Sequence, residues 1–439
     1  MRNGFIFDHN KCVSCNACCA ACILENGWKV HPRNIFTYNS TAEHFLPVIN
    51  LSLACNHCES GACMKGCPAS AYRREPDTGA IIIDEKLCIG CRYCQWICPY
   101  DAPKFDIISG TIAKCNLCYT GLKDGLQPAC SSACPTGALS FGQVSDQNSD
   151  IIYSWFPDKK LYPSIEFTGT VKESSLKIIP ENIFKQKEKE PLIETKDISD
   201  DISLIIFSFL ATLSVATIII SFLRGVYPGK MVFIPALVLT GVVSLFHLGR
   251  KLRSWRSVMN VRNSPISREI LLLIIYGLIS SVTVLSHIPV LLIISSITGI
   301  IFLVVIDSVY VYAERSKSVR AHSGQTFISA LLIVSYFAGD VLPFIFIGSL
   351  KIAYSLYSFA SKKQGKTTFE IRFLRLAFLI ISGVSMISHI SYSDIFVSIM
   401  FLAGELLDRI IFYIDFNPIN IKTMILDQIN IDKDEKERG

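Results

Sequence analysis

The sequence predicts two different folds in one chain: an α+β domain rich in cysteine, followed by an all-α bundle of eight transmembrane helices. Three observations predict this division. All seventeen cysteines lie before residue 135. After residue 202, uncharged apolar segments recur that are long enough to cross a bilayer as helices. Between the halves, residues 185–201 (KQKEKEPLIETKDISDD) are charged and poor in aromatic residues, as in a solvated linker.

Sixteen of the cysteines form four runs of four. The runs are Cys12, Cys15, Cys18, Cys22; Cys55, Cys58, Cys63, Cys67; Cys88, Cys91, Cys94, Cys98; and Cys115, Cys118, Cys130, Cys134. A [4Fe–4S] cubane needs one thiolate for each iron, so four such runs match four cubanes. The sequence therefore predicts a ferredoxin-like polyferredoxin domain with two pseudo-symmetric dicluster units.

Disulfide bonds and zinc sites are the alternatives for these cysteines. The start of the chain, MRNGFIFDHNKC, lacks the apolar stretch of a signal peptide, so we expect this half to fold in a reducing compartment, where disulfides are rare. Zinc favours two separated CxxC pairs. The first and third runs instead have the spacing C-x2-C-x2-C-x3-C, with Pro99 after the third, which is typical of iron–sulfur ligation.

In two-cluster ferredoxins the fourth cysteine of each run ligates the other cluster. The long segment between Cys22 and Cys55, together with the split fourth run, favours an outer pair of runs (first with fourth) and an inner pair (second with third). The predicted ligand sets are Cys12, Cys15, Cys18 with Cys134; Cys22 with Cys115, Cys118, Cys130; Cys55, Cys58, Cys63 with Cys98; and Cys67 with Cys88, Cys91, Cys94. Cys19 lies outside every set and is predicted to be a packed free thiol.

Residues 1 to about 170 resemble the iron–sulfur subunit of dimethyl sulfoxide reductase and its relatives in the molybdopterin oxidoreductase group. The strings that carry the resemblance are CNHCESGACMKGCP, CRYCQWICPYDAPKF, and KCNLC followed by PACSSACPTGAL. The resemblance implies the same cluster pairing and a separate catalytic subunit that holds the molybdopterin. One departure is CYTGLKDG, where the family usually has an arginine after the second cysteine of the fourth run.

The second half contains eight apolar segments that predict membrane-spanning helices. The segments are 202–223, 231–248, 270–287, 289–312, 323–339, 342–360, 373–391 and 395–414. The loops after the second, fourth and sixth segments, together with Arg375 at the start of the seventh segment, carry fourteen Lys and Arg residues, against two in the loops after the odd-numbered segments. Because positive charge marks the cytoplasmic side, both termini and the cysteine-rich domain are predicted to be cytoplasmic.

This half resembles the membrane-anchor subunit of the same reductase family, so the chain looks like a fusion of two subunits that are usually separate. The matching strings are FHLGR (246–250), NSPISREI (263–270) and GELLDRIIFY (404–413). The resemblance implies a quinone-binding anchor without haem. Family relatives often place the catalytic subunit outside the cytoplasm, so the predicted orientation departs from that pattern.

Ionisable residues in apolar segments are costly and must be explained by pairing or by function. Oxidation of a quinol releases two protons, so a quinol site needs proton acceptors, and we predict His247 and Glu269 for this role. Glu405 and Arg409, spaced i and i+4, are predicted to form an ion pair within one helix. Lys351 must also have a partner, but the sequence does not name it.

Haem is the alternative cofactor of the membrane half. His287 and His389 both end apolar segments on the charge-poor side and could ligate one haem b. A histidine at a segment end is more often hydrogen-bonded or interfacial, so the sequence favours a bundle without haem.

The predicted organisation is an iron–sulfur domain at 1–171, a charged linker at 172–201, an eight-helix anchor at 202–414 and a polar tail at 415–439. The predicted function is a non-catalytic electron-transfer and anchor subunit in the cytoplasmic membrane. It would link menaquinol or another quinol to a molybdopterin-containing partner, without binding nucleic acid. The alternative is the reverse direction, as the quinone-reducing subunit of a formate or sulfur-compound dehydrogenase. A membrane redox sensor is a third interpretation, although a sensor needs only one labile cluster.

Overall fold

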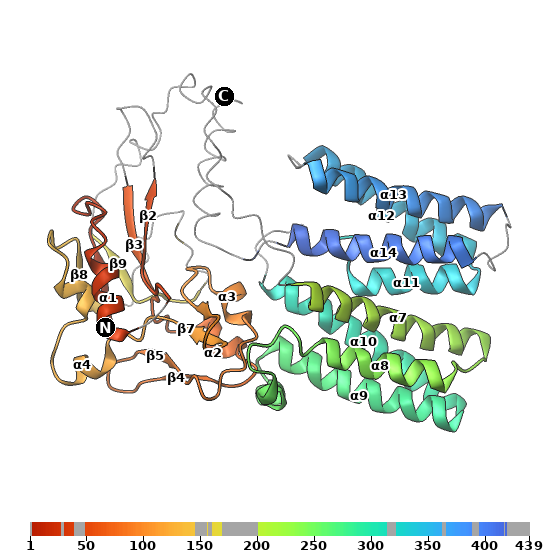
Figure 1. The fold of residues 1–439 in the computed structure, drawn as a ribbon, viewed down its shortest axis with the longest axis horizontal. Helices are drawn as coiled ribbons and strands as arrows, with labels where there is room; N and C mark the ends of the chain where they lie inside the picture. Colours follow the sequence, from red (N-terminus) through yellow and green to blue (C-terminus); the bar gives the residue numbers. More distant parts are fainter. Residues whose placement is uncertain are drawn as a thin grey trace, which may run out of the picture. The chain divides into compact units, whose positions relative to one another are not determined.

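The computed structural model describes residues 2–27, 30–38, 49–144, 156, 160–168, 201–313, 322–361, 366–388, 395–416 and 418 (Figure 1). The chain divides into two compact units. The first comprises residues 1–195, 248–263 and 418–439, and the second comprises residues 196–247 and 264–417. Residues 248–263, which the sequence places between two apolar segments, therefore belong to the cysteine-rich unit.

Short strands and helices build the first unit. They are β1 (Arg2–Phe7), α1 (Ala17–Asn26), β2 (Asn34–Tyr38), β3 (Ile49–Leu53), α2 (Ala62–Gly66), β4 (Tyr72–Arg74), β5 (Ile81–Ile83), α3 (Tyr93–Ile97), β6 (Lys104–Asp106), β7 (Thr111–Ala113), α4 (Tyr119–Lys123), α5 (Ala129–Ser132), β8 (Leu139–Val144) and β9 (Ile165–Phe167). A 3-10 helix, η3 (Lys251–Val258), also lies in this unit. The mixture of strands and helices agrees with the predicted α+β class.

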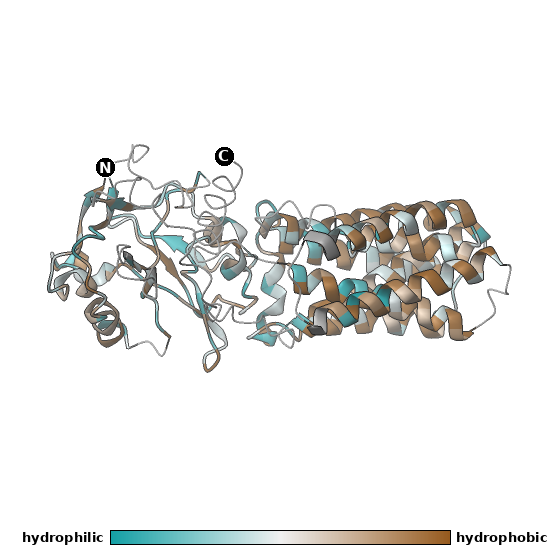
Figure 2. Cartoon of the chain, turned by 90° about the horizontal axis from the view of Figure 1, so that it is seen from above, coloured by the Kyte–Doolittle hydropathy of each residue, from teal (hydrophilic) through white to brown (hydrophobic). Residues whose placement is uncertain are grey.

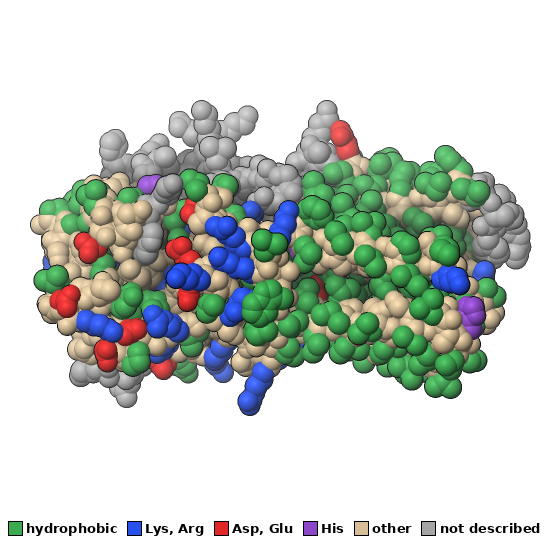
Figure 3. Space-filling model, turned by 60° about the horizontal axis from the view of Figure 1, so that its bottom comes forward, with side chains coloured by type: hydrophobic (Ala, Val, Ile, Leu, Met, Phe, Trp, Pro, Cys, Tyr) green, Lys and Arg blue, Asp and Glu red, His purple; other side chains and the backbone are tan. Residues whose placement is uncertain are grey.

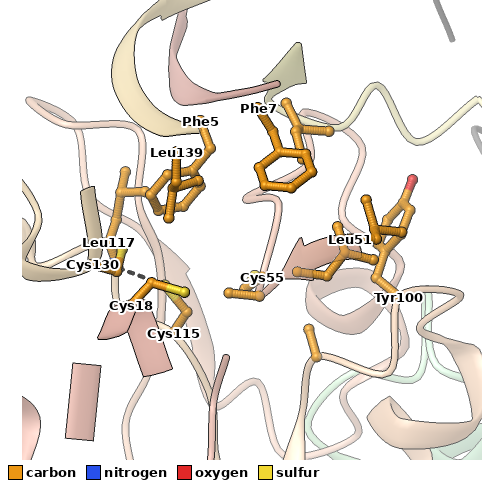
Figure 4. Packing of buried hydrophobic residues seen from close by; sticks show 14 of the residues in the cluster. Phe5, Phe7, Cys18, Leu51, Cys55, Tyr100, Cys115, Leu117, Cys130 and Leu139 are labelled. Carbon is orange, nitrogen blue, oxygen red and sulfur yellow. Dashed lines mark hydrogen bonds between the residues drawn. The ribbon is translucent and has the colours of Figure 1, made fainter. Parts of the chain in front are cut away.

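A three-stranded sheet in the order β8-β1-β9 organises the core of this unit. β1 runs antiparallel to β8 and parallel to β9. Side chains two residues apart on a strand point to the same face, so Phe5 and Phe7 enter the core together. Figure 4 shows both rings in one apolar cluster with Leu117, Leu139 and several cysteines. The other strands form the antiparallel hairpins β2-β3, β4-β5 and β6-β7.

Eight helices make up the described part of the second unit, one at each of the eight predicted segments. They are α7 (Ile202–Arg224), α8 (Lys230–Val243), α9 (Pro265–Ser286), α10 (Pro289–Ala313), α11 (Thr326–Ala338), α12 (Val341–Ser361), α13 (Lys366–Ile387) and α14 (Ile395–Asp415). Three of them, α7, α9 and α10, are long and apolar enough to cross a membrane. That all eight helices span a bilayer stays a prediction.

The helices run alongside one another, with α9 packed on α10, α13 on α14, and α7 on both α10 and α11 (Figure 1). Gly299 permits the close approach of α10 to α7, because a Cβ atom there would lie 2.9 Å from the Val215 side chain. Hydrophobic residues dominate these helices (Figure 2) and cover much of their visible surface (Figure 3). Large exposed apolar side chains such as Met231, Leu342 and Ile395 make this surface suitable for contact with lipid.

Two predicted segments are longer than the helices that occupy them. The segment 231–248 contains α8, which ends at Val243. Further along the chain, the Gly249 and Arg250 amides donate to the carbonyls of Gly90 and Ile89 instead of to a preceding helical turn. His247 is therefore in a turn and not at a helix end, as the sequence had suggested. Likewise, α11 is shorter than the predicted segment 323–339.

Candidate iron–sulfur and quinol sites

The two inner cysteine sets each line a cavity. One cavity is lined by Cys55, Cys58, Cys63 and Cys98, among other residues. The other is lined by Cys67, Cys88, Cys91 and Cys94, among other residues. Both quartets are the sets predicted from the spacing, and each takes its cysteines from two different runs. Apolar side chains such as Ile81 and Ile112 complete the two linings.

The two outer sets also gather in space. Cys12 lies close enough to Cys15, Cys18 and Cys134 for their charges to interact. Similar interactions join Cys22 to Cys118 and Cys130, and Cys115 to Cys22 and Cys130. Figure 4 shows Cys18, Cys115 and Cys130 close together within the apolar core of the unit. The inner sets thus line two cavities, and cysteines of the outer sets interact with one another, while the ligand sets themselves stay predictions.

A repeated backbone turn aims amide groups at the first cysteine of three runs. The amide two residues further on donates to the cysteine sulfur: His57 to Cys55 at 3.5 Å, Gly90 to Cys88 at 3.4 Å, and Leu117 to Cys115 at 3.4 Å. His57, Gly90 and Leu117 all have positive φ, which turns each amide toward the sulfur. Amide donors of this kind stabilise a thiolate, the form in which cysteine binds metal.

Burial raises the pKa of most of these thiols. The pKa of Cys98 and that of Cys22 each rise to about 12, and the pKa values of Cys58 and Cys94 also rise, in each case chiefly because the charged form is desolvated. Buried thiolates need a positive partner, which a bound metal supplies. The inner quartets also line cavities. This donor arrangement fits [4Fe–4S] clusters, which would supply one-electron transfer when bound.

Cys19 has a more specific place than the sequence suggested. It lies beside Cys18 on α1, and the neighbouring Cys19 thiol is the largest cause of a lowered pKa at Cys18. Ser52 Oγ lies 3.4 Å from the same Cys18 sulfur. A second cysteine next to a ligand position was the only sequence signal for this contact.

Residues 248–263 contact the backbone around the Cys67 and Cys88 site. Arg253 Nη1 donates to the Cys88 carbonyl at 3.1 Å and to the Glu85 carbonyl at 2.6 Å. Asn260 Nδ2 donates to the Cys67 carbonyl at 2.9 Å. At Gly249 an added Cβ atom would lie 2.2 Å from the Gly110 carbonyl oxygen, so only glycine permits this backbone approach. No pattern in the sequence indicated that this segment is part of the cysteine-rich unit.

The two predicted quinol-site residues differ in their surroundings. His247 is half-buried in the turn after α8. Glu269 is 8% exposed on α9, and it forms no hydrogen bond or ion pair with any residue that the structure describes. The two side chains make no hydrogen bond or ion pair with each other.

Buried ion pairs join α14 to three other helices, α10, α12 and α13. The predicted ion pair between Glu405 and Arg409 within one helix is wrong, because each side chain has a partner on another helix. The ion pairs are Lys351–Glu405 (2.5 Å), Lys351–Asp408 (3.1 Å), Arg375–Asp408 (2.9 Å), Arg409–Asp307 (3.6 Å) and Arg372–Asp415 (2.6 Å). Where helices pack closely, a charged side chain can form its ion pair with a residue on the facing helix instead of with its i, i+4 neighbour. The partners that Lys351 requires are thus Glu405 and Asp408.

Of the two histidines of the haem alternative, the structure describes His287. His287 ends α9 with positive φ, is exposed, and accepts a hydrogen bond on its carbonyl from the Tyr227 hydroxyl at 2.7 Å. His389 lies outside the described residues. The absence of haem therefore stays a prediction.

Comparison with known proteins identifies the first part of the sequence. Residues 47–144 match a family model described as a 4Fe-4S dicluster domain. An anaerobic dimethyl sulfoxide reductase chain of Haemophilus influenzae is 39% identical over 154 residues, which cover 33% of this chain and 75% of the relative. The probable anaerobic dimethyl sulfoxide reductase chain YnfG of Escherichia coli is 37% identical over 153 residues, covering 33% of this chain and 74% of the relative.

A sulfite dehydrogenase subunit of Allochromatium vinosum is 32% identical over 169 residues, covering 33% of this chain and 70% of that relative. All three matches lie in the cysteine-rich third, and the eight helices are additional to it. The resemblance found in the sequence is confirmed: through its N-terminal part, this protein belongs to the family of iron–sulfur subunits that includes the matching dimethyl sulfoxide reductase chains of Haemophilus influenzae and Escherichia coli.

Proposed function

We propose that this chain is the electron-transfer and membrane-anchor subunit of an oxidoreductase complex, carrying four [4Fe–4S] clusters between membrane quinol and a separate molybdopterin-containing catalytic subunit. The main support is the convergence of sixteen cysteines into four quartets, each built from the predicted runs. Each [4Fe–4S] cluster carries one electron at a time. A quinol gives up two electrons, so it would pass them to the clusters one after the other.

Membrane anchorage is supported by the helical unit. Three described helices have the length and composition of membrane spans, and the outer surfaces of the helices carry large apolar side chains. The fourteen basic residues in and beside the loops that follow α8, α10 and α12 favour a multi-pass protein of the cytoplasmic membrane with its iron–sulfur unit on the cytoplasmic side. The relatives are named as parts of reductases or dehydrogenases, which favours a partner that holds the substrate site.

We place the quinol site at His247 and Glu269. Residues 248–263 follow His247 directly in the sequence and contact the Cys67 and Cys88 carbonyls. Glu269 is buried and has no ion-pair partner among the described residues, so its carboxylate is available to accept a proton.

The reverse direction is the second candidate. One relative is named as a subunit of sulfite dehydrogenase, so membership of the family is compatible with electron flow from substrate to quinone. The reduction potentials of the clusters against that of the quinone pool decide the direction. Potentiometric titration distinguishes the two: clusters well below the quinone potential favour quinone reduction.

The proposed quinol site is tested by mixing the anaerobic, oxidised protein with a menaquinol analogue and recording cluster reduction. His247→Ala should abolish this reduction while dithionite still reduces all clusters. Glu269→Gln should slow it, because the amide keeps the side-chain shape but cannot accept the proton. Wild-type rates in both variants would move the site elsewhere. His389→Ala is the matched control, and a loss of reduction confined to it would favour the haem alternative.

A further inference from the structure

Arg33 is a fully buried cation without a carboxylate partner in the described structure. It directly precedes β2, and only 2% of its surface is exposed. Its guanidinium carbon lies 4.5 Å from the centre of the Phe5 ring. No ion pair joins Arg33 to any aspartate or glutamate that the structure describes. A buried charge left unpaired is strongly destabilising, so a negative partner must compensate for it.

Only one edge of the guanidinium is satisfied by hydrogen bonds. Arg33 Nη1 donates to Ser52 Oγ at 3.0 Å and to the Ser52 carbonyl at 3.4 Å. Nε and Nη2 are buried and have no hydrogen-bond partner among the described residues. Arginine presents donors on a planar fork, so an acceptor on the second edge would use the donors that Ser52 leaves free.

Arg33 interacts with cysteines of both outer sets. Ser52 Oγ, which accepts from Arg33, lies 3.4 Å from Cys18 Sγ and links the guanidinium to the set that contains Cys18. Cys22, Cys115 and Cys130, three members of the other outer set, also interact with the Arg33 charge. Arginine stays protonated in proteins, so Arg33 holds a positive charge beside these sulfurs.

We propose that Arg33 is the shared counter-charge of the two outer iron–sulfur clusters and raises the reduction potential of both. This role rests on the proposed function, because it needs clusters at the outer cysteine sets. One-electron reduction adds a negative charge to a cluster, and a fixed cation nearby stabilises that charge. Arg33 is thus a positioning residue: it orders Ser52 against Cys18 and holds a positive charge between two anionic sites.

The test is a potentiometric titration of the full-length protein, purified anaerobically, with mediators and dithionite as reductant. Cluster signals are followed by electron paramagnetic resonance, and Cys130→Ser and Cys134→Ser assign the outer ones. Arg33→Gln should shift two of the four potentials to more negative values and leave the inner two unchanged. Arg33→Lys keeps the charge and should retain most of the wild-type potentials. Ser52→Ala should shift mainly the cluster held by Cys18.

Arg2→Gln is the matched control. Its guanidinium lies 3.8 Å from the Glu59 carboxylate, so it has the partner that Arg33 lacks, and its removal should leave all four potentials unchanged. If Arg33→Gln loses iron from the outer pair alone while Arg33→Lys retains it, the counter-charge role is supported. Equal loss in both variants overturns it.

Two further outcomes separate this role from the proposed function. A wild-type chain with clusters in the inner pair alone would contradict the proposed function and the role of Arg33 together. A four-cluster chain in which Arg33→Gln leaves every potential unchanged, or shifts all four equally, would contradict only the role of Arg33.

Discussion

Lys351 Nζ lies 2.5 Å from Glu405 Oε2 inside the helical unit, where the two side chains are 1% and 3% exposed. The pair joins α12 to α14. Asp408 shares the same ammonium at 3.1 Å and also accepts from Arg375, which lies on α13. Three helices are therefore linked by one buried cluster of charges, and removal of any member leaves another charge without its full set of partners.

Lys351→Met should destabilise the helical unit by about 3–5 kcal/mol, because Glu405 and Asp408 lose a buried cation. Glu405→Gln should cost less, since Asp408 still pairs with Lys351. In the double variant the loss should be smaller than the sum of the single losses. Thermal unfolding in lipid nanodiscs, followed by circular dichroism, measures this. Ser349→Ala, an exposed position on the same helix, is the control. A Lys351→Met protein as stable as this control would contradict the prediction.

Gly249→Ala should separate residues 248–263 from the Cys67 and Cys88 site. The new methyl group would meet the Gly110 carbonyl oxygen, and overpacking of this kind costs about 1–3 kcal/mol. We expect faster iron release to a chelator, confined to one cluster, and new protease cleavage within the segment. Gly142→Ala is the control, because its nearest contact would be an ordinary 3.5 Å from Ile6. Equal rates of iron release in the two variants would show that the segment does not protect the site.

Sidedness follows from the loop charges. A reporter fused after Gly439 should behave as cytoplasmic, as should a reporter inserted in the 185–201 linker, because the basic loops lie on the side of both termini. Green fluorescent protein should fluoresce and alkaline phosphatase should be inactive at both positions. High phosphatase activity at the C-terminus would overturn the orientation and place the catalytic partner on the other side of the membrane.

The local parts of this architecture could be predicted from the sequence, and the long-range contacts could not. Cysteine spacing indicates the ligand sets because the first three cysteines of a run bind one cluster and the fourth binds the cluster of the paired run. Apolar length indicates the helices because a span needs a fixed number of residues. Arg33 carries no such signal: its role depends on Ser52 and on sulfurs that the fold brings to it from other elements. Lys351 needed a partner because an unpaired buried charge is costly. Helix packing, which the sequence does not show, determined that Glu405 is a partner.

The end of α8 and the assignment of residues 248–263 were also beyond the sequence. The apolar pattern continues to Leu248, whereas the helix ends at Val243, and beyond it the Gly249 and Arg250 amides bond to the Gly90 and Ile89 carbonyls. Those bonds depend on a close approach of two backbone segments, which Gly249 permits because it has no Cβ atom. The hydropathy of a sequence contains no information about such contacts. The same lack of information explains why the Glu405–Arg409 prediction failed, since spacing along one helix says nothing of the helices that face it.

The cluster count tests the central claim most directly. Iron and acid-labile sulfide should be measured per chain in the full-length protein purified anaerobically. Four cubanes, each held by four cysteines, predict about sixteen of each. Cys94→Ser should lower the iron content by about four and alter one inner cluster only. A wild-type content near eight would contradict the assignment of four clusters and with it the proposed electron path.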